Sequence, residues 1–147
     1  MKRISVQVNS FFIEIILVIL FFAISVTVTL QLFVAANNRA QQSSDLSVSV
    51  IQAENIAEQV LSLTSSDQVP QALKTAQLKN DETYLICYDK DWNQTKSEPR
   101  FVMGVTLKKT PSAGGTMVSA DIDVYRRQNG SQKDIYSLSS SKYLPSD

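Results

Sequence analysis

The stretch FFIEIILVILFFAISVTVTLQLFVAA, residues 11–36, contains one charged side chain, that of Glu14. At about 1.5 Å per residue, a helix of this length rises roughly 39 Å. The hydrocarbon core of a bilayer is about 30 Å thick, so such a helix crosses it with room for tilt. We therefore predict one membrane-spanning helix over residues 11–36.

The second half of this span is more polar than the first. It contains Ser25, Thr27, Thr29 and Gln31. Hydroxyl groups in a helix can donate to carbonyl oxygens of the preceding turn, and Gln31 falls near the far interface of the membrane. None of these residues therefore prevents insertion.

A cleaved signal peptide is the competing interpretation of the same stretch. Lys2 and Arg3 form a short basic region, and the small residues before Asn37 resemble a cleavage site. The apolar core of a signal peptide is about 7 to 15 residues long, however, and this one is longer. The length therefore favours a membrane anchor.

The charges that flank the span predict its orientation. Lys2 and Arg3 precede it, and only Arg39 follows closely. Basic residues favour the cytoplasmic side of a membrane. We expect residues 1–10 to be a short cytoplasmic leader, the span to lie in the cytoplasmic (inner) membrane, and the rest of the chain to be extracytoplasmic.

Glu14 is the candidate functional residue of the span. A carboxylate inside a bilayer costs at least about 2.5 kcal/mol, so a specific partner is the expected reason for keeping one. The alternative is that Glu14, close to the start of the run, extends its side chain to the headgroups at little cost.

The composition excludes several classes of chemistry. The chain has no histidine, one cysteine (Cys87), and 14 basic against 14 acidic residues. Without histidine, catalytic pairs built on imidazole and the usual zinc sites are excluded. A single cysteine forms no intramolecular disulfide. The balanced charge, without blocks of one sign, predicts no nucleic-acid partner.

Beyond the span, the sequence predicts that the helix continues as an amphipathic one over residues 37–64. No Gly or Pro interrupts residues 37–45, and Ser and Thr gather over residues 62–66, where the helix is expected to end. Apolar residues recur at steps of three and four, with Glu54 and Glu58 on the other side. These apolar residues are Leu46, Val50, Ala53, Ala57, Val60 and Leu61.

Residues 65–147 are predicted to form a small α+β domain. Ser66 or Asp67 is expected to cap a short second helix, with Pro70 in its first turn and Val69, Leu73 and Leu78 on its apolar face. Four strands are predicted from β-branched and aromatic residues, over residues 83–88, 100–108, 117–126 and 134–139. Loops are expected at 89–99, 109–115 and 128–132, the last containing the turn signal Asn129-Gly130. We expect a four-stranded antiparallel meander whose apolar face is covered by the helix over residues 46–61.

This order of parts resembles the type IV pilin and type II secretion pseudopilin superfamily. The likeness is closest over residues 12–19, FIEIILVI. In that family a glutamate stands fifth in the mature chain, which implies a processing site between Asn9 and Ser10. The processing peptidase of the family expects Gly before the cut and usually Phe after it, and this chain departs from both.

The resemblance implies a function in assembly. The chain is expected to be a minor pseudopilin-like subunit that packs by its helical stem into a filament, with other subunits and an assembly platform as partners. A basic group, from Lys2, Arg3 or a neighbouring subunit, is expected to pair with Glu14.

Two other classes of function remain open. The first is a single-pass, signal-anchored extracytoplasmic domain for binding or adhesion that assembles with nothing. The second is an enzyme, which would depend on Asp121, Asp123 or Cys87. The two aspartates alternate on the expected solvent face of one strand, and Cys87 is expected to pack as a small apolar residue. We predict no enzyme and no cofactor.

A calcium loop is the last alternative. Asp89, Asp91 and Asn93 have the spacing of its first ligands, but the Gly and the distal Glu are missing at the required offsets. A solvated turn is the favoured interpretation, and we predict no metal. Trp92, in the same loop, is either a contact residue or a lid on the edge of the sheet.

Overall fold

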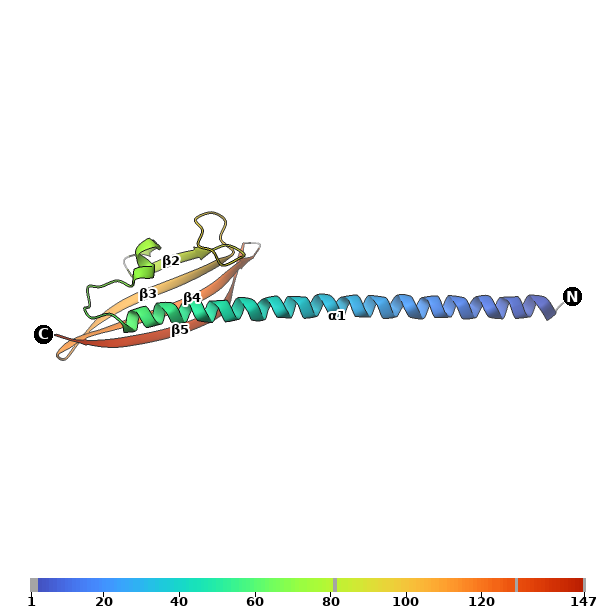
Figure 1. Cartoon of the computed structure of the whole chain (residues 1–147), viewed down its shortest axis with the longest axis horizontal. Helices are drawn as coiled ribbons and strands as arrows, with labels where there is room; N and C mark the ends of the chain where they lie inside the picture. Colours follow the sequence, from blue (N-terminus) through green and yellow to red (C-terminus); the bar gives the residue numbers. More distant parts are fainter. Residues whose placement is uncertain (1–2, 81, 129, 147) are drawn as a thin grey trace. The chain divides into compact units, whose positions relative to one another are not determined.

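The computed structural model describes residues 3–80, 82–128 and 130–146, with side chains from Ser10 onward. Its described residues form one α-helix, α1 (Arg3–Leu61), one 3-10 helix, η1 (Gln71–Thr75), and five strands (Figure 1). The strands are β1 (Gln77–Asn80), β2 (Thr83–Tyr88), β3 (Phe101–Ser112), β4 (Gly115–Gln128) and β5 (Ser131–Pro145). The predicted α+β class, a long N-terminal helix followed by an antiparallel sheet, is confirmed. The chain divides into two compact units, Met1–Ser43 and Ser44–Asp147.

The sheet is antiparallel with the order β1-β2-β3-β4-β5, so the prediction of four strands was wrong. β1 was not predicted, because its four residues are all exposed and three of them are polar. Leu78, assigned to the apolar face of a helix, lies in β1 and is 59% exposed. A side chain makes the connection to β2: Asn80 Oδ1 accepts hydrogen bonds from the amides of Glu82 and Thr83.

The predicted loop over residues 109–115 was also wrong, because β3 and β4 continue through it. Ser112 pairs with Gly115, which leaves a two-residue turn in which Gly114 has a φ of 80°. Pro111 is tolerated in β3 because the pairing with β2 ends at Thr106. Beyond that residue one edge of β3 has no partner strand, so the missing N–H of a proline there removes no hydrogen bond between strands.

The turn between β4 and β5 lies where it was predicted. Gln128 pairs with Ser131, and Gly130 has the positive φ, 78°, that a two-residue hairpin turn requires. Asn129 lies outside the described residues. β5 continues to Pro145, well beyond the predicted 134–139, because pairing with β4 holds a serine-rich segment of weak strand propensity.

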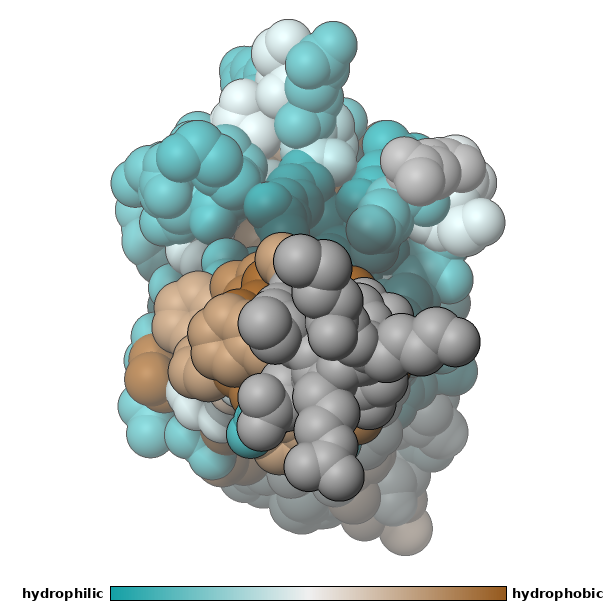
Figure 2. All heavy atoms as spheres, turned by 90° about the vertical axis from the view of Figure 1, so that its right-hand side faces the viewer, coloured by the Kyte–Doolittle hydropathy of each residue, from teal (hydrophilic) through white to brown (hydrophobic). Residues whose placement is uncertain are grey.

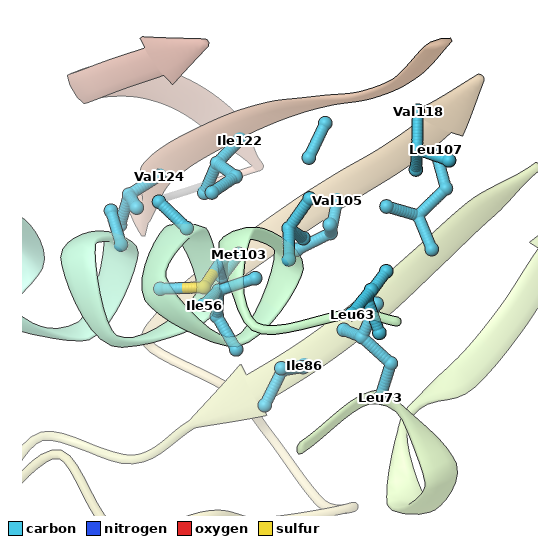
Figure 3. Packing of buried hydrophobic residues seen from close by; sticks show 14 of the residues in the cluster. Ile56, Leu63, Leu73, Ile86, Met103, Val105, Leu107, Val118, Ile122 and Val124 are labelled. Atoms are coloured by element: carbon cyan, nitrogen blue, oxygen red, sulfur yellow. The ribbon is translucent and has the colours of Figure 1, made fainter. Parts of the chain in front are cut away.

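The core lies between the C-terminal part of α1 and one face of the sheet (Figure 3). This confirms that the helix covers the sheet. Its largest fully buried members include Phe101, Met103, Ile122, Val60 and Leu73. The predicted stripe was wrong at both ends, because Leu46 is 42% and Leu61 47% exposed.

Two residues missing from the predicted stripe take part in the packing of α1. Ser49 is fully buried, and Ile56 is 4% exposed. The hydroxyl of Ser49 donates to the carbonyl oxygen of Asp45 at 2.7 Å, which satisfies its donor without a partner from the sheet. The buried positions therefore follow helical spacing, with a serine in place of an apolar residue.

α1 ends at Leu61 and is capped by a residue of β5. The Lys142 Nζ atom donates to the carbonyl oxygens of Leu61 and Leu63, the latter at 2.7 Å. Carbonyl groups in the last turn of a helix have no partner within the helix, and a cation there also interacts favourably with the helix dipole. The cap therefore holds the helix end against the sheet.

The predicted second helix is reduced to the single turn η1. Its N-cap is Pro70, with no hydrogen bond from a side chain, so the predicted caps Ser66 and Asp67 were wrong. Leu73 is buried as expected. Pro70 lacks an amide hydrogen, and the turn is held instead by backbone bonds that include Leu73 N to Pro70 O at 3.0 Å.

Candidate functional site

α1 is, among the described residues, the one helix long and apolar enough to cross a membrane, and the candidate span lies near the N-terminus. The side chains of residues 10–36 are exposed, including Phe21 at 69% and Phe33 at 73%. Exposed apolar surface of this extent is unfavourable in water and favourable in lipid. The finding supports single-pass anchoring in a membrane.

The hydroxyl groups in this segment are satisfied within the helix. Ser25 donates to the carbonyl oxygen of Phe21, Thr27 to that of Ala23 and Thr29 to that of Ser25, at 2.8 to 2.9 Å. This confirms the expectation that the hydroxyls bond back to the preceding turn. The polar half of the segment thus presents no unpaired hydroxyl donor to lipid.

Glu14 lies on α1 with an exposed side chain, one helical turn after Ser10. Asn9 and Ser10, the proposed processing site, lie on the same helix. Arg3 is the first residue of α1, and Lys2 lies outside the described residues. The structure therefore gives Glu14 a position on the apolar helix and leaves its partner as a prediction.

An ion pair that the sequence did not reveal joins α1 to β4. Arg126 Nη1 lies 3.2 Å from Asp45 Oδ2, and the two side chains are 14% and 17% exposed. Arg126 Nε is buried and has no hydrogen-bond partner among the described atoms. The two residues are 81 positions apart, so only the tertiary fold brings them together.

Asp121 and Asp123 lie on the face of β4 opposite the core, as predicted. Asp121 Oδ1 accepts a hydrogen bond from Ser139 Oγ at 2.8 Å, and Asp123 Oδ1 accepts one from Ser137 Oγ at 2.7 Å. The hydrogen bond from Ser139, followed by the one from Lys108, lowers the pKa of Asp121. Each carboxylate is thus engaged by a serine of β5 across the strand pair, and the lowered pKa of Asp121 is the opposite of what a general acid requires.

Cys87 is partly exposed on the same outer face of the sheet. It pairs in register with Val102 of β3, which pairs in turn with Tyr125 of β4. Val102 is 2% exposed, so this row forms a small apolar patch outside the main core. The surroundings provide no histidine or other imidazole to activate the thiol.

The loop after β2 uses its aspartate to hold a turn. Asp89 Oδ1 accepts hydrogen bonds from the amides of Asp91 at 2.8 Å and Asn93 at 3.0 Å. The amide of Asn93 is the main reason that the pKa of Asp89 is lowered. Among the described residues, no group of three His, Cys, Asp or Glu side chains is placed to hold a metal ion.

Trp92 acts as a lid on the sheet. Its ring stacks on that of Phe101, with ring centroids 4.2 Å apart and an angle of 11° between the ring planes. It also contacts the ring of Tyr88. Trp92 adopts a φ of 62°, a conformation that few non-glycine residues adopt. The stacking and the Asp89 turn together hold the backbone in this form.

Comparison with known proteins adds no relative. No protein-family model, no curated protein and no solved structure matches the chain.

Proposed function

We propose that this protein is a membrane-anchored, pilin- or pseudopilin-like subunit that assembles through its helical stem. The observation that carries the proposal is the position of Glu14 on an exposed apolar helix that continues, as α1, into the core of an antiparallel sheet domain. This layout is pilin-like. A helix of 59 residues is far longer than a small domain needs for its own packing.

The energetics of Glu14 give the helix a reason to associate. A lone carboxylate is unfavourable in lipid and becomes favourable when a cation of a neighbouring subunit reaches it. Such a contact also fixes the axial register of two helices, as single buried polar residues do in coiled coils. The remaining apolar side chains provide contact area without selecting a register.

The sheet domain has a surface suited to water, which supports a position outside the lipid. The part of it visible in Figure 2 is mostly hydrophilic, whereas hydrophobic side chains gather on the helix. Its thiol is single, and its stability rests on packing and hydrogen bonds. We propose that this domain lies outside the cytoplasmic membrane, where protease added to spheroplasts digests it and leaves the N-terminus protected.

Crosslinking between stems in native cells tests the assembly proposal. A single cysteine is placed at Leu20 in a Cys87→Ser background, and disulfide formation is induced in intact membranes. We expect the parent to crosslink, Glu14→Leu to insert normally but lose most of the product, and Glu14→Gln to lose less because it keeps hydrogen-bonding capacity. Glu14→Lys should be the weakest, because it replaces attraction with repulsion.

Val18→Leu is the matched control, because it changes the span without changing its charge. It should crosslink like the parent. If Glu14→Leu also gives the parental yield, the assembly role of Glu14 is wrong, and a membrane-anchored binding domain that acts alone becomes the better description.

A further inference from the structure

Residues 37–44, NNRAQQSS, form an unusual part of α1. All eight side chains are exposed to solvent, although the segment is helical throughout. The residues before it, 11–36, form the apolar run, and the helix positions from Asp45 onward begin to pack on the sheet. The segment therefore has neither a lipid-facing apolar surface nor a buried face.

The composition of this segment is weak for a helix. Asn and Ser rank below Ala, Leu, Gln and Arg in intrinsic helix propensity, because their side chains compete for backbone hydrogen bonds. Four of the eight residues are of these two types. Helices shorter than about 12 residues are marginal in water unless an apolar face is buried. Lipid stabilises the helix before this segment, and packing on the sheet stabilises the helix after it. The segment between them is stabilised by neither.

Both ends of the segment carry residues suited to helix termini. Asn37 and Asn38 follow the apolar span, and Asn is, after Gly, the residue that best adopts the left-handed conformation after a helix C-terminus. Ser43 and Ser44 come just before the packed part, which begins at Asp45, and Ser and Asp are preferred N-caps. A break here would leave a capped helix on each side, with Asp45 near the positive end of the second.

We propose that residues 37–44 are a latent break in α1, which opens to coil in a local equilibrium while residues 11–36 and 45–61 stay helical. As a helix, the eight residues rise about 12 Å, whereas an extended chain of the same length spans up to roughly 26 Å. Opening would therefore lengthen the tether of the sheet domain without unfolding it. This inference does not depend on the assembly proposal.

Hydrogen exchange of the full chain in lipid nanodiscs tests the break. After correction for intrinsic rates, we expect the amides of residues 38–44 to exchange at least about tenfold faster than those of residues 53–60, a segment that packs on the sheet through Ala53, Ile56, Ala57 and Val60. Equal protection of the two segments would overturn the proposal.

A matched pair of variants separates a latent break from simple exposure to solvent. Replacing Asn37, Asn38 and Ser44 together by Ala raises helix propensity, and we expect exchange across residues 37–44 to slow about tenfold. The control replaces the exposed residues Glu54, Asn55 and Glu58 by Ala and should leave that exchange unchanged. An equal response to both variants, or to neither, would contradict the proposal.

Trypsin provides a second readout, because Arg39 lies inside the segment. A protease cleaves a locally extended chain, so cleavage after Arg39 reports the opened form. We expect cleavage in the parent and in the control, and about tenfold slower cleavage in the triple alanine variant. Cleavage after Arg39 at one rate in all three proteins would speak against local opening.

Discussion

Arg126 Nη1 donates to Asp45 Oδ2 at 3.2 Å, and this contact fastens α1 to β4 where the helix begins to pack on the sheet. At the other end of the packed segment, Lys142 of β5 caps the helix after Leu61. Polar contacts thus lie at both ends of an interface whose centre is apolar. Because apolar packing alone is not directional, these contacts fix how far the helix can slide along the sheet.

The first prediction concerns the Asp45–Arg126 pair. Asp45→Ala leaves a largely buried guanidinium without its anion, and we expect the free energy of unfolding to fall by about 2 kcal/mol. Urea unfolding in mild detergent, followed through the single tryptophan, Trp92, measures the change. The exposed pair of Lys108 and Asp121 is the control, because Lys108→Ala should cost less than about 1 kcal/mol. Equal losses would show that burial does not distinguish the two pairs.

Gly115 provides a prediction about the turn between β3 and β4. A Cβ atom at this position would lie 2.2 Å from the carbonyl oxygen of Leu144 and 2.8 Å from the ring of Tyr143. Tyr143 also donates to the carbonyl oxygen of Ala113 at 3.1 Å, so its ring is not free to move away. We expect Gly115→Ala to lower the thermal midpoint by an amount equivalent to about 2 kcal/mol.

Gly104 is the matched control for that substitution. A Cβ atom there would meet its nearest neighbour, Leu85 Cδ2, at 3.8 Å, which is ordinary van der Waals contact. Gly104→Ala should therefore change the midpoint little, by less than about 1 kcal/mol in equivalent free energy. A larger loss for Gly104→Ala than for Gly115→Ala would contradict the geometry of this turn.

The next prediction concerns the pKa of Asp121, which the hydrogen bond from Ser139 lowers. A carboxyl with a lowered pKa in the folded state stabilises the fold above its unfolded pKa of about 3.9 and loses that contribution as the pH falls through the folded value. Ser139→Ala should raise the pKa of Asp121, as measured by NMR titration. Ser141→Ala should leave it unchanged, because Ser141 pairs with Ser119.

The sequence predicted those elements whose signal is local. The apolar run, the alternating residues of β4 and the hairpin at Gly130 each depend on neighbours in the chain, and all three lie as expected. β1 was missed because its polar residues become a strand only when β2 lies beside them. The same reason explains Pro111. In the sequence alone a proline favours a loop, and only the tertiary structure shows that β2 ends before Pro111 and leaves one edge of β3 unpaired there.

The residues discussed for the candidate site also differ in whether their signal in the sequence is local. Glu14 was proposed as a site residue because one charge in an apolar run is visible in the sequence itself, and its role stays a prediction. The Asp45–Arg126 pair and the Lys142 cap were not, because their partners are about 80 residues away and each residue alone resembles an ordinary surface charge. Contacts of this kind follow from topology, which the predicted four-stranded sheet did not reproduce in full.

The last prediction tests whether the C-terminal part of α1 belongs to the folded unit of the sheet domain. Ala53, Ile56 and Val60 belong to the same buried cluster as the strands, so removing them exposes the apolar face of the sheet. A chain of residues 37–147 should be soluble and unfold cooperatively, whereas one of residues 65–147 should aggregate. Val60→Asp in the longer chain is the sharper variant, because it keeps the helix and places a charge in the core, and it should aggregate as well. Sedimentation and the urea transition measure both effects, and equal solubility of all three chains would mean that the helix does not complete this core.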